Sequence, residues 1–158
     1  MADEQKPLSV AIAVLIKEDE ILLIKRKKAD YIGYWALPGG KIKHNEHVSE
    51  AAIRELKEET GIDADFLEYC GLVSERLIDG AEQKHFLLNL CLLKLNNADY
   101  PGDHDKKWFS LSKLESYKEI IIPSDMEMIY RMVKNKEKNY FDCVIEKDKD
   151  QLHLKKFK

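Results

Sequence analysis

The chain has 158 residues, of which 44% are hydrophobic and 35% charged, as is typical of one soluble globular domain. Its 26 Lys and Arg against 29 Asp and Glu give a net charge of −3, which argues against a stable nucleic-acid complex held by bulk charge. No apolar run reaches the roughly 18 residues of a membrane span, and the polar start of the chain predicts no signal peptide. Its three widely spaced cysteines form no CxxC pair, so we expect buried free thiols and a cytoplasmic location.

The first part of the chain predicts two strands, a loop and a helix. Apolar, β-prone residues at 8–16 and 21–24 indicate strands that are buried on both faces. Turn-forming residues are frequent over 29–45, which predicts a long functional loop. A helix is expected over 47–60, because Gly61 follows it at the position of a C-cap.

The second part of the chain predicts a mixed α/β arrangement. The expected elements are strands at 67–76 and 85–95, a short strand at 107–111, a helix at 124–136 and a hairpin of strands at 140–146 and 151–157. This order predicts one domain over 1–158, with helices on both faces of a mixed sheet. We expect 138–158 to be an ordered C-terminal hairpin extension that covers a sheet edge or joins a homodimer interface.

Three carboxylates crowd one side of the predicted helix. At 100° per residue, Glu55, Glu58 and Glu59 fall within about 100° of one another, beside the apolar stripe. One interpretation is a solvated acidic face, offset by Arg54 and Lys57. The other is a site for Mg²⁺ or Mn²⁺, which prefer oxygen ligands and bind together with substrate phosphates.

The residues around this helix favour the metal site. The glycines of the preceding segment, 37–40 (Leu-Pro-Gly-Gly), allow the backbone to approach a metal or phosphate closely. The segment from Gly40 to Ile62 resembles the signature of the Nudix hydrolases, G-x5-E-x7-R-E-U-x-E-E-x-G-U, where U is a bulky aliphatic residue. Every specified position is filled, by Gly40, Glu46, Arg54, Glu55, Leu56, Glu58, Glu59, Gly61 and Ile62.

The resemblance implies a Nudix-type α/β/α sandwich that hydrolyses a nucleoside diphosphate linked to another group, by attack of water on the pyrophosphate. It implies metal ligation by Glu55, Glu58, Glu59 and the Gly39 carbonyl. It also implies that Glu46 is an accessory carboxylate and that Arg54 orients the glutamates. Clustered divalent ions would neutralise the phosphate oxygens and activate the water.

Other residues are candidates for substrate binding. Arg26, within the basic run 25–28, matches a residue that many relatives point toward phosphates; the alternative is a solubilising cluster. Trp35 is expected either to stack on a base or to pack under the loop. Gly39 and Gly40 are expected to line the substrate site. Lys43 stands where the family often has Glu, and it either adds positive charge near a phosphate or is a solvated loop lysine.

Two residues just before or at the start of the helix depart from the family pattern. Asn45 stands where the family often has Gly, and asparagine tolerates the left-handed turn. His47 occupies the usual helix N-cap, so we expect Asn45 or Ser49 to cap instead.

The general base is either Asp105, or Asp103 of the same loop, or a signature glutamate (Glu55 or Glu58); the alternative for the loop is a solvated turn.

The substrate is left open by the sequence. Residues 77–80 hold neither the Pro nor the Tyr that marks some substrate subgroups of the family. ADP-ribose-like sugar nucleotides and (d)NTPs, including damaged ones, are the candidates. The alternatives are a non-catalytic nucleotide-binding regulator, against which the complete set of glutamates argues, and an RNA-end decapping hydrolase, against which the acidic charge balance argues.

Overall fold

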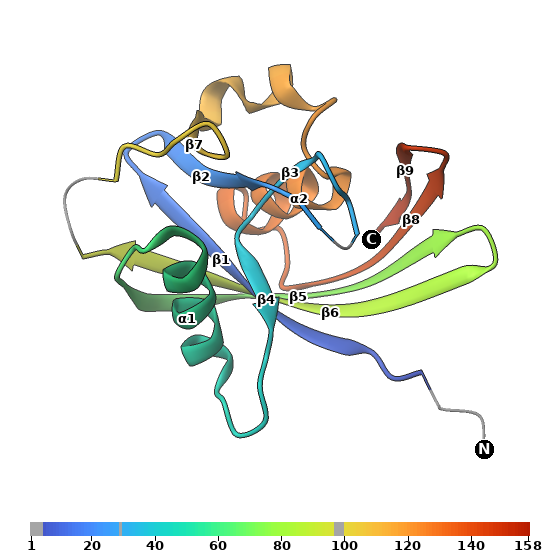
Figure 1. Cartoon of the computed structure of the whole chain (residues 1–158), viewed down its shortest axis with the longest axis horizontal. Coiled ribbons are helices and arrows are strands. Elements are labelled where there is room, and N and C mark those ends of the chain that lie inside the picture. Colours follow the sequence, from blue (N-terminus) through green and yellow to red (C-terminus); the bar gives the residue numbers. More distant parts are fainter. Residues whose placement is uncertain (1–4, 29, 97–99) are drawn as a thin grey trace.

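The computed structural model describes residues 5–28, 30–96 and 100–158, and its centre is a curled mixed sheet (Figure 1). The strands run in the order β3-β2-β1-β6-β5-β8-β9, while β4 pairs with β1 and β7 with β2. Their bounds are β1 Leu8–Lys17, β2 Glu20–Lys25, β3 Trp35–Ala36, β4 Gly39–Lys41, β5 Ala64–Asp79, β6 Glu82–Leu95, β7 Lys106–Ser110, β8 Tyr140–Asp148 and β9 Gln151–Phe157. Residues 1–4, the first part of the segment in which we expected no signal peptide, and residue 29, the first of the predicted loop, lie outside the described residues.

The strands that were predicted to be buried lie in the middle of the sheet. β1 is parallel to β6, and β5 is parallel to β8, whereas β1 with β2 and β5 with β6 are antiparallel. Neighbours on both edges and helices on both faces explain why β1 and β2 read as continuous apolar runs. The mixed sheet therefore matches the predicted fold class.

Helices cover both faces of this sheet (Figure 1). Their bounds are α1 Val48–Thr60, η1 Leu111–Tyr117, α2 Pro123–Glu127 and η2 Met128–Lys134. Ala51, Ala52 and Leu56 of α1 pack into one hydrophobic core with β1 and β6. Met126, Met128, Ile129 and Met132 pack into a second core together with residues of the C-terminal hairpin. The sandwich therefore has one core on each side of the sheet.

The predicted helix 124–136 differs in its winding. A short α-helical turn begins at Pro123, and from Met128 the backbone continues as a π-helix. The Asn135 amide donates to the Tyr130 carbonyl, five residues back, at 2.9 Å. Packing of the methionine side chains against the sheet overrides the regular period that the sequence predicted.

The C-terminal hairpin is an integral part of the sheet. β8 extends the parallel pairing along β5, and β9 pairs antiparallel with β8. Phe141 and Phe157 pack their rings at 4.7 Å between centroids. The predicted ordered hairpin over a sheet edge is thus confirmed, while its role in a homodimer stays a prediction.

Two smaller expectations concern the thiols and the membrane. The three cysteines are free, as expected; Cys91 and Cys143 are buried, but Cys70 is only half-buried, because it lies at a bulge of β5 against β6. None of the described helices is long and apolar enough to cross a membrane.

Candidate active site

Helix α1 begins and ends through local interactions. Its N-cap is His47, whose backbone N–H donates to the Glu50 carboxylate at 2.9 Å. The expectation that Asn45 or Ser49 caps the helix is therefore wrong, because a carboxylate in the first turn satisfies the free amide. Asn45 does adopt the predicted left-handed conformation, with φ 63°. Gly61 ends the helix, also left-handed, with its N–H bonded to the Lys57 carbonyl at 2.8 Å.

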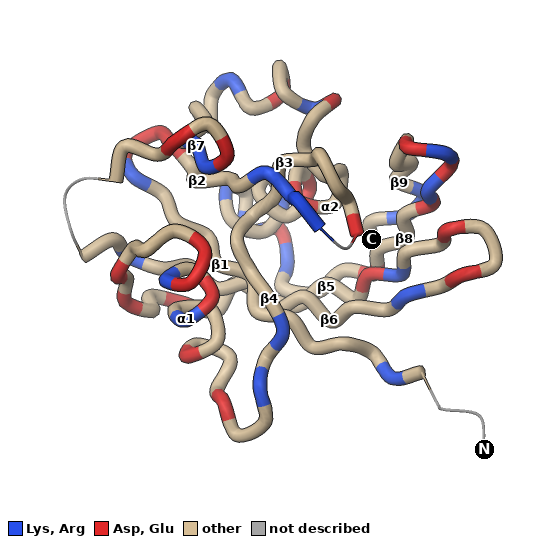
Figure 2. The backbone as a smooth tube through the Cα atoms, viewed as in Figure 1, with Lys and Arg blue, Asp and Glu red and all other residues tan. Residues whose placement is uncertain are grey.

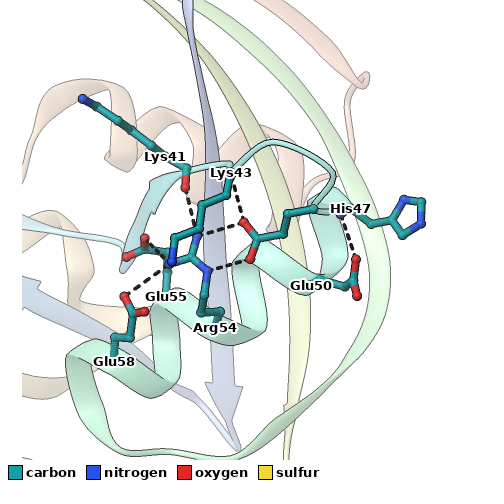
Figure 3. A network of polar contacts seen from close by, with 8 residues as sticks. Lys41, Lys43, His47, Glu50, Arg54, Glu55 and Glu58 are labelled. Carbon is teal, nitrogen blue, oxygen red and sulfur yellow. Dashed lines mark hydrogen bonds and ion pairs between the residues drawn. The ribbon is translucent and has the colours of Figure 1, made fainter.

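Arg54 organises the acidic residues of this helix (Figure 3). Its guanidinium donates to both oxygens of Glu46, at 2.6 and 2.9 Å, and to Glu55 at 2.8 Å. It also donates to Glu58 at 3.2 Å and to the Lys41 carbonyl of β4 at 3.0 Å. One charged side chain thus holds three carboxylates and ties the helix to the preceding strand.

The hydrogen bonds around Arg54 determine the ionisation and the role of Glu46. The hydrogen bonds from Arg54, together with the Lys43 backbone N–H, lower the pKa of Glu46 to about 2. Its carboxylate is therefore ionised at neutral pH and committed to Arg54. This arrangement makes Glu46 a positioning group for Arg54, which in turn orients Glu55 and Glu58.

Glu59 has no hydrogen bond to the arginine and is half-buried. Its carboxylate accepts a hydrogen bond from the Gly39 N–H at 3.0 Å. Burial, together with the nearby Glu55, raises the pKa of Glu59 to about 7, although the Gly39 hydrogen bond and the charge of Arg26 oppose the shift. A nearby cation would therefore stabilise the ionised form of Glu59.

Glycine is required beneath these carboxylates. A Cβ built at Gly40 would collide with the carboxylate of Glu55, and one built at Gly39 would collide with the Ala11 carbonyl of β1. The two glycines therefore let β4 lie close both to its partner strand β1 and to the helix. This close approach brings the Gly39 backbone to the same cavity as Glu55 and Glu59.

The glutamates open into a cavity of about 440 Å³, here called the first cavity. It is lined by the α1 glutamates Glu55, Glu58 and Glu59, and by Asp105 together with the basic residues Lys25, Arg26, Lys27, Lys28 and Lys106. Figure 2 shows the basic residues grouped at the end of β2 and the acidic residues along α1. A cavity with carboxylates on one side and cations on the other suits a metal–phosphate ligand.

The donor set of the first cavity fits a hard divalent cation. Arg54 occupies one oxygen of Glu55 and one of Glu58, and the Gly39 N–H occupies one of Glu59. Among the described residues, the second oxygen of each of these carboxylates has no hydrogen-bond partner. Carboxylate oxygens are ligands that Mg²⁺ or Mn²⁺ accepts, although among the described residues only Asp103, His104 and Asp105 have ligand atoms that all lie within 4.8 Å of one another.

Asp105 lies in the wall of the first cavity, as a catalytic role requires. Its carboxylate pairs with Lys27 at 2.5 Å and with His104 at 3.3 Å, and the Asp105 carbonyl accepts the Lys25 N–H at 2.8 Å. The hydrogen bond from Lys27 lowers the pKa of Asp105. Asp103 does not line the cavity; it accepts the Asp105 N–H and pairs with Lys106.

Two predicted substrate contacts lie outside the cavities. Trp35 is 7% exposed, packs edge-on against Phe109 at 5.2 Å and lies under the Lys107 ammonium. It therefore packs under the loop, which was the alternative interpretation. Lys43 is exposed and lines neither cavity, and its backbone N–H donates to the Glu46 carboxylate.

A second cavity of about 1130 Å³ adjoins the first, and Arg26 and Gly39 line both. Sequence reasoning missed two buried acidic residues in its lining, Glu75 and Asp125; the lining also includes Asp30 and Glu82. A signal for Glu75 was present, because the period of two along β5 places it on the inward side, between Val73 and Leu77. Asp125 gave no comparable signal, since an acidic residue is common in the first turn of a helix.

The sandwich fold carries an acidic helix that faces basic residues across one cavity, an arrangement that suits a phosphate ligand bound together with a cation. The model of the NUDIX domain matches residues 5–131, and the chain belongs to this family. Among its relatives, the ADP-ribose pyrophosphatase of Methanocaldococcus jannaschii is 32% identical over 111 residues, which cover 68% of this chain and 64% of that protein. The 8-oxo-dGTP diphosphatase of Buchnera aphidicola is 38% identical over 58 residues, covering 36% of this chain and 45% of that protein.

A solved structure supports the same assignment. The crystal structure of a MutT protein from Methanosarcina mazei superimposes with a TM-score of 0.69 at 25% identity, over 87% of this chain and all of that one. The match confirms the predicted α/β sandwich fold. The chain spans less than two thirds of the length of the two relatives named above.

Proposed function

We propose that this protein is a divalent-metal-dependent hydrolase of a nucleoside diphosphate linked to another group. The observation that carries the proposal is a set of three glutamates that face basic residues across one cavity, Glu55 and Glu58 held by Arg54 and Glu59 held by the Gly39 N–H. The names of the two relatives, a pyrophosphatase of ADP-ribose and a diphosphatase of 8-oxo-dGTP, support the same bond type. They also leave both substrate classes open.

In this proposal, one group of residues of the first cavity binds the phosphates and another binds the metal. Arg26 and the neighbouring lysines bind and orient the phosphates, while Glu55, Glu58, Glu59 and the Gly39 carbonyl hold Mg²⁺ or Mn²⁺. When bound, such an ion neutralises non-bridging phosphate oxygens and lowers the pKa of a coordinated water. Arg54 and Glu46 keep the glutamates in place, so that little reorganisation is needed when substrate binds.

The reaction is the displacement of one phosphate oxygen by water. The water oxygen forms a bond to one phosphorus, the bond from that phosphorus to the bridging oxygen breaks, and a carboxylate takes the proton. Asp105 is the proposed base, with Glu55 or Glu58 as the alternative. The products are two phosphate-ended fragments, one of them a nucleoside monophosphate for a nucleotide sugar.

The test is a panel of nucleotides in which products are identified as well as rates. ADP-ribose, other nucleotide sugars and the (d)NTPs, including 8-oxo-dGTP, would each be incubated with Mg²⁺ or Mn²⁺ and analysed by chromatography. We expect turnover that stops with chelator and returns with metal. Binding without turnover of any member, with metal present, would instead identify a nucleotide-binding regulator.

A further inference from the structure

One basic residue of the first cavity is already paired with an acid of the same cavity. The Lys27 ammonium lies 2.5 Å from the Oδ2 atom of Asp105, and both residues line the first cavity. Among the described residues, no other basic residue in this lining forms an ion pair with an acid that also lines the cavity. Lys106 pairs with Asp103, which lies outside the cavity. A substrate phosphate that enters the cavity therefore has a competitor for Lys27.

The aspartate of this pair is fixed by its backbone, whereas the lysine has room to move. The Asp105 N–H donates to Oδ1 of Asp103 at 2.8 Å, and the Asp105 carbonyl accepts the Lys25 N–H, also at 2.8 Å. The next residue along the chain begins β7, which pairs with β2 (Figure 1). The Lys27 side chain lies two residues beyond the end of β2 and is 66% exposed. If the pair separates, the lysine is the partner that moves.

The charges around the pair favour such a separation. An ion pair with an exposed lysine is weak, because water solvates the ammonium. A phosphate carries more charge than a carboxylate and offers several oxygens to the three N–H donors of lysine. The other groups that act on the Asp105 charge are His104, which favours the ionised carboxylate, and Asp103, which opposes it. Neither of these lines the first cavity, so Lys27 is the partner that a phosphate there can reach.

We propose that Lys27 exchanges partners when substrate binds: its ammonium binds Asp105 in the free protein and a substrate phosphate once a nucleotide enters the first cavity. The aspartate then loses its paired cation when the substrate is in place, and a carboxylate without such a cation takes a proton from water more readily. An aspartate has an ordinary pKa of about 4, so Asp105 stays ionised at neutral pH after the exchange. The inference rests on the proposed function for the role of Asp105 as base, whereas the exchange itself requires only that phosphate binds in this cavity.

The direct test is a double-mutant cycle on the binding of a phosphate ligand that hydrolysis cannot cut. Methylenediphosphonate, in which carbon replaces the bridging oxygen, would be titrated by calorimetry, with Mg²⁺ present, into the wild-type protein, Lys27→Gln, Asp105→Asn and the double variant. We expect Asp105→Asn to bind it at least about threefold more tightly than the wild type, because the lysine no longer leaves a partner. In the Lys27→Gln background, the benefit of the same change should be at least about threefold smaller.

The cycle separates the exchange from simple repulsion between Asp105 and the phosphates. Removing the aspartate relieves such repulsion equally with and without the lysine, so equal effects of Asp105→Asn in both backgrounds would overturn the inference. Lys28→Gln is the matched control, because Lys28 lines the same cavity and forms no ion pair with the residues that the structure describes. It should weaken the binding of methylenediphosphonate without altering the effect of Asp105→Asn.

A substrate identified by the nucleotide panel gives a kinetic test. Lys27→Gln should raise KM at least about threefold, since a phosphate contact is lost, and leave kcat within about twofold, since Asp105 has no lysine partner during turnover in either protein. A lysine that stayed with Asp105 throughout would instead orient the base, and its removal would lower kcat. A fall in kcat of about tenfold or more at unchanged KM would therefore contradict the exchange.

The two proposals fail separately. Coupling between Lys27 and Asp105 in a protein that hydrolyses no nucleotide would support the exchange and refute the proposed function. Metal-dependent hydrolysis without such coupling would do the reverse.

Discussion

Glu59 illustrates at the scale of one residue how burial prepares a carboxylate for a cation. Glu59→Gln keeps the size of the side chain and can still accept the Gly39 N–H, but it removes the charge. We expect kcat to fall at least about 100-fold while the far-UV circular dichroism is unchanged. Glu50→Gln on the same helix is the control, because its carboxylate serves only the His47 cap. A fully active Glu59→Gln protein would refute the metal site.

The general base is the second prediction at this scale. The ion pair with Lys27 keeps Asp105 ionised, as a base must be, and places it across the cavity from the glutamates. Asp105→Asn should lower kcat at least about 100-fold with little change in the metal concentration needed for activity. Asp103→Asn, outside the cavity, should retain activity. Near-normal kcat in both variants would show that neither aspartate of the loop is the base, so that Glu55 or Glu58 of α1 activates the water.

At the scale of the element, the C-terminal hairpin contributes buried side chains to the second core. Phe157 is 7% exposed, packs on Phe141 and lies near the Arg131 guanidinium, whose Nη1 donates to the Phe157 carbonyl at 2.6 Å. Phe157→Ala should lower the free energy of unfolding by about 3 kcal/mol or more, measured by urea denaturation. The exposed Lys155→Ala should change it by less than about 0.5 kcal/mol.

The same hairpin should resist proteolysis in the native protein. Its backbone is paired in the sheet, and local opening would expose Phe141 and Ile145, which are fully buried. Limited digestion should therefore leave 138–158 attached, as mass spectrometry would show. Rapid loss of this segment without loss of stability would contradict its place in the core.

At the scale of the whole molecule, buried acids make stability depend on pH. The pKa of Asp125 is about 7 in the folded chain and about 4 when unfolded, so its ionisation favours the unfolded chain. The free energy of unfolding should fall as pH rises from about 4 to about 7. Asp125→Asn, which can still accept the Leu37 N–H, should show a smaller fall in urea denaturation across this range. Identical slopes for the two proteins would show that Asp125 is ionised without cost.

The metal-binding half of the site could be predicted from the sequence because its geometry is local. Glu55, Glu58 and Glu59 occupy one side of a single helix, and the helical period alone brings them together. The place of Arg54 beside Glu58 follows from the same period, whereas the end of the helix follows from the left-handed conformation that Gly61 adopts. The N-cap was predicted wrongly, because cap preferences favour Asn or Ser over His, whereas the helix begins at His47 with the Glu50 carboxylate accepting the His47 N–H.

What the sequence by itself determined is therefore the class of chemistry, because the residues that define it are neighbours on one helix and its preceding strand. The tertiary structure alone decided what faces that helix. It brought the Lys25–Lys28 run and Asp105 across the first cavity, packed Trp35 against Phe109, and placed Glu75 and Asp125 in one wall. These residues come from separate strands and loops, and only the pairing of strands and burial of both cores sets their distances.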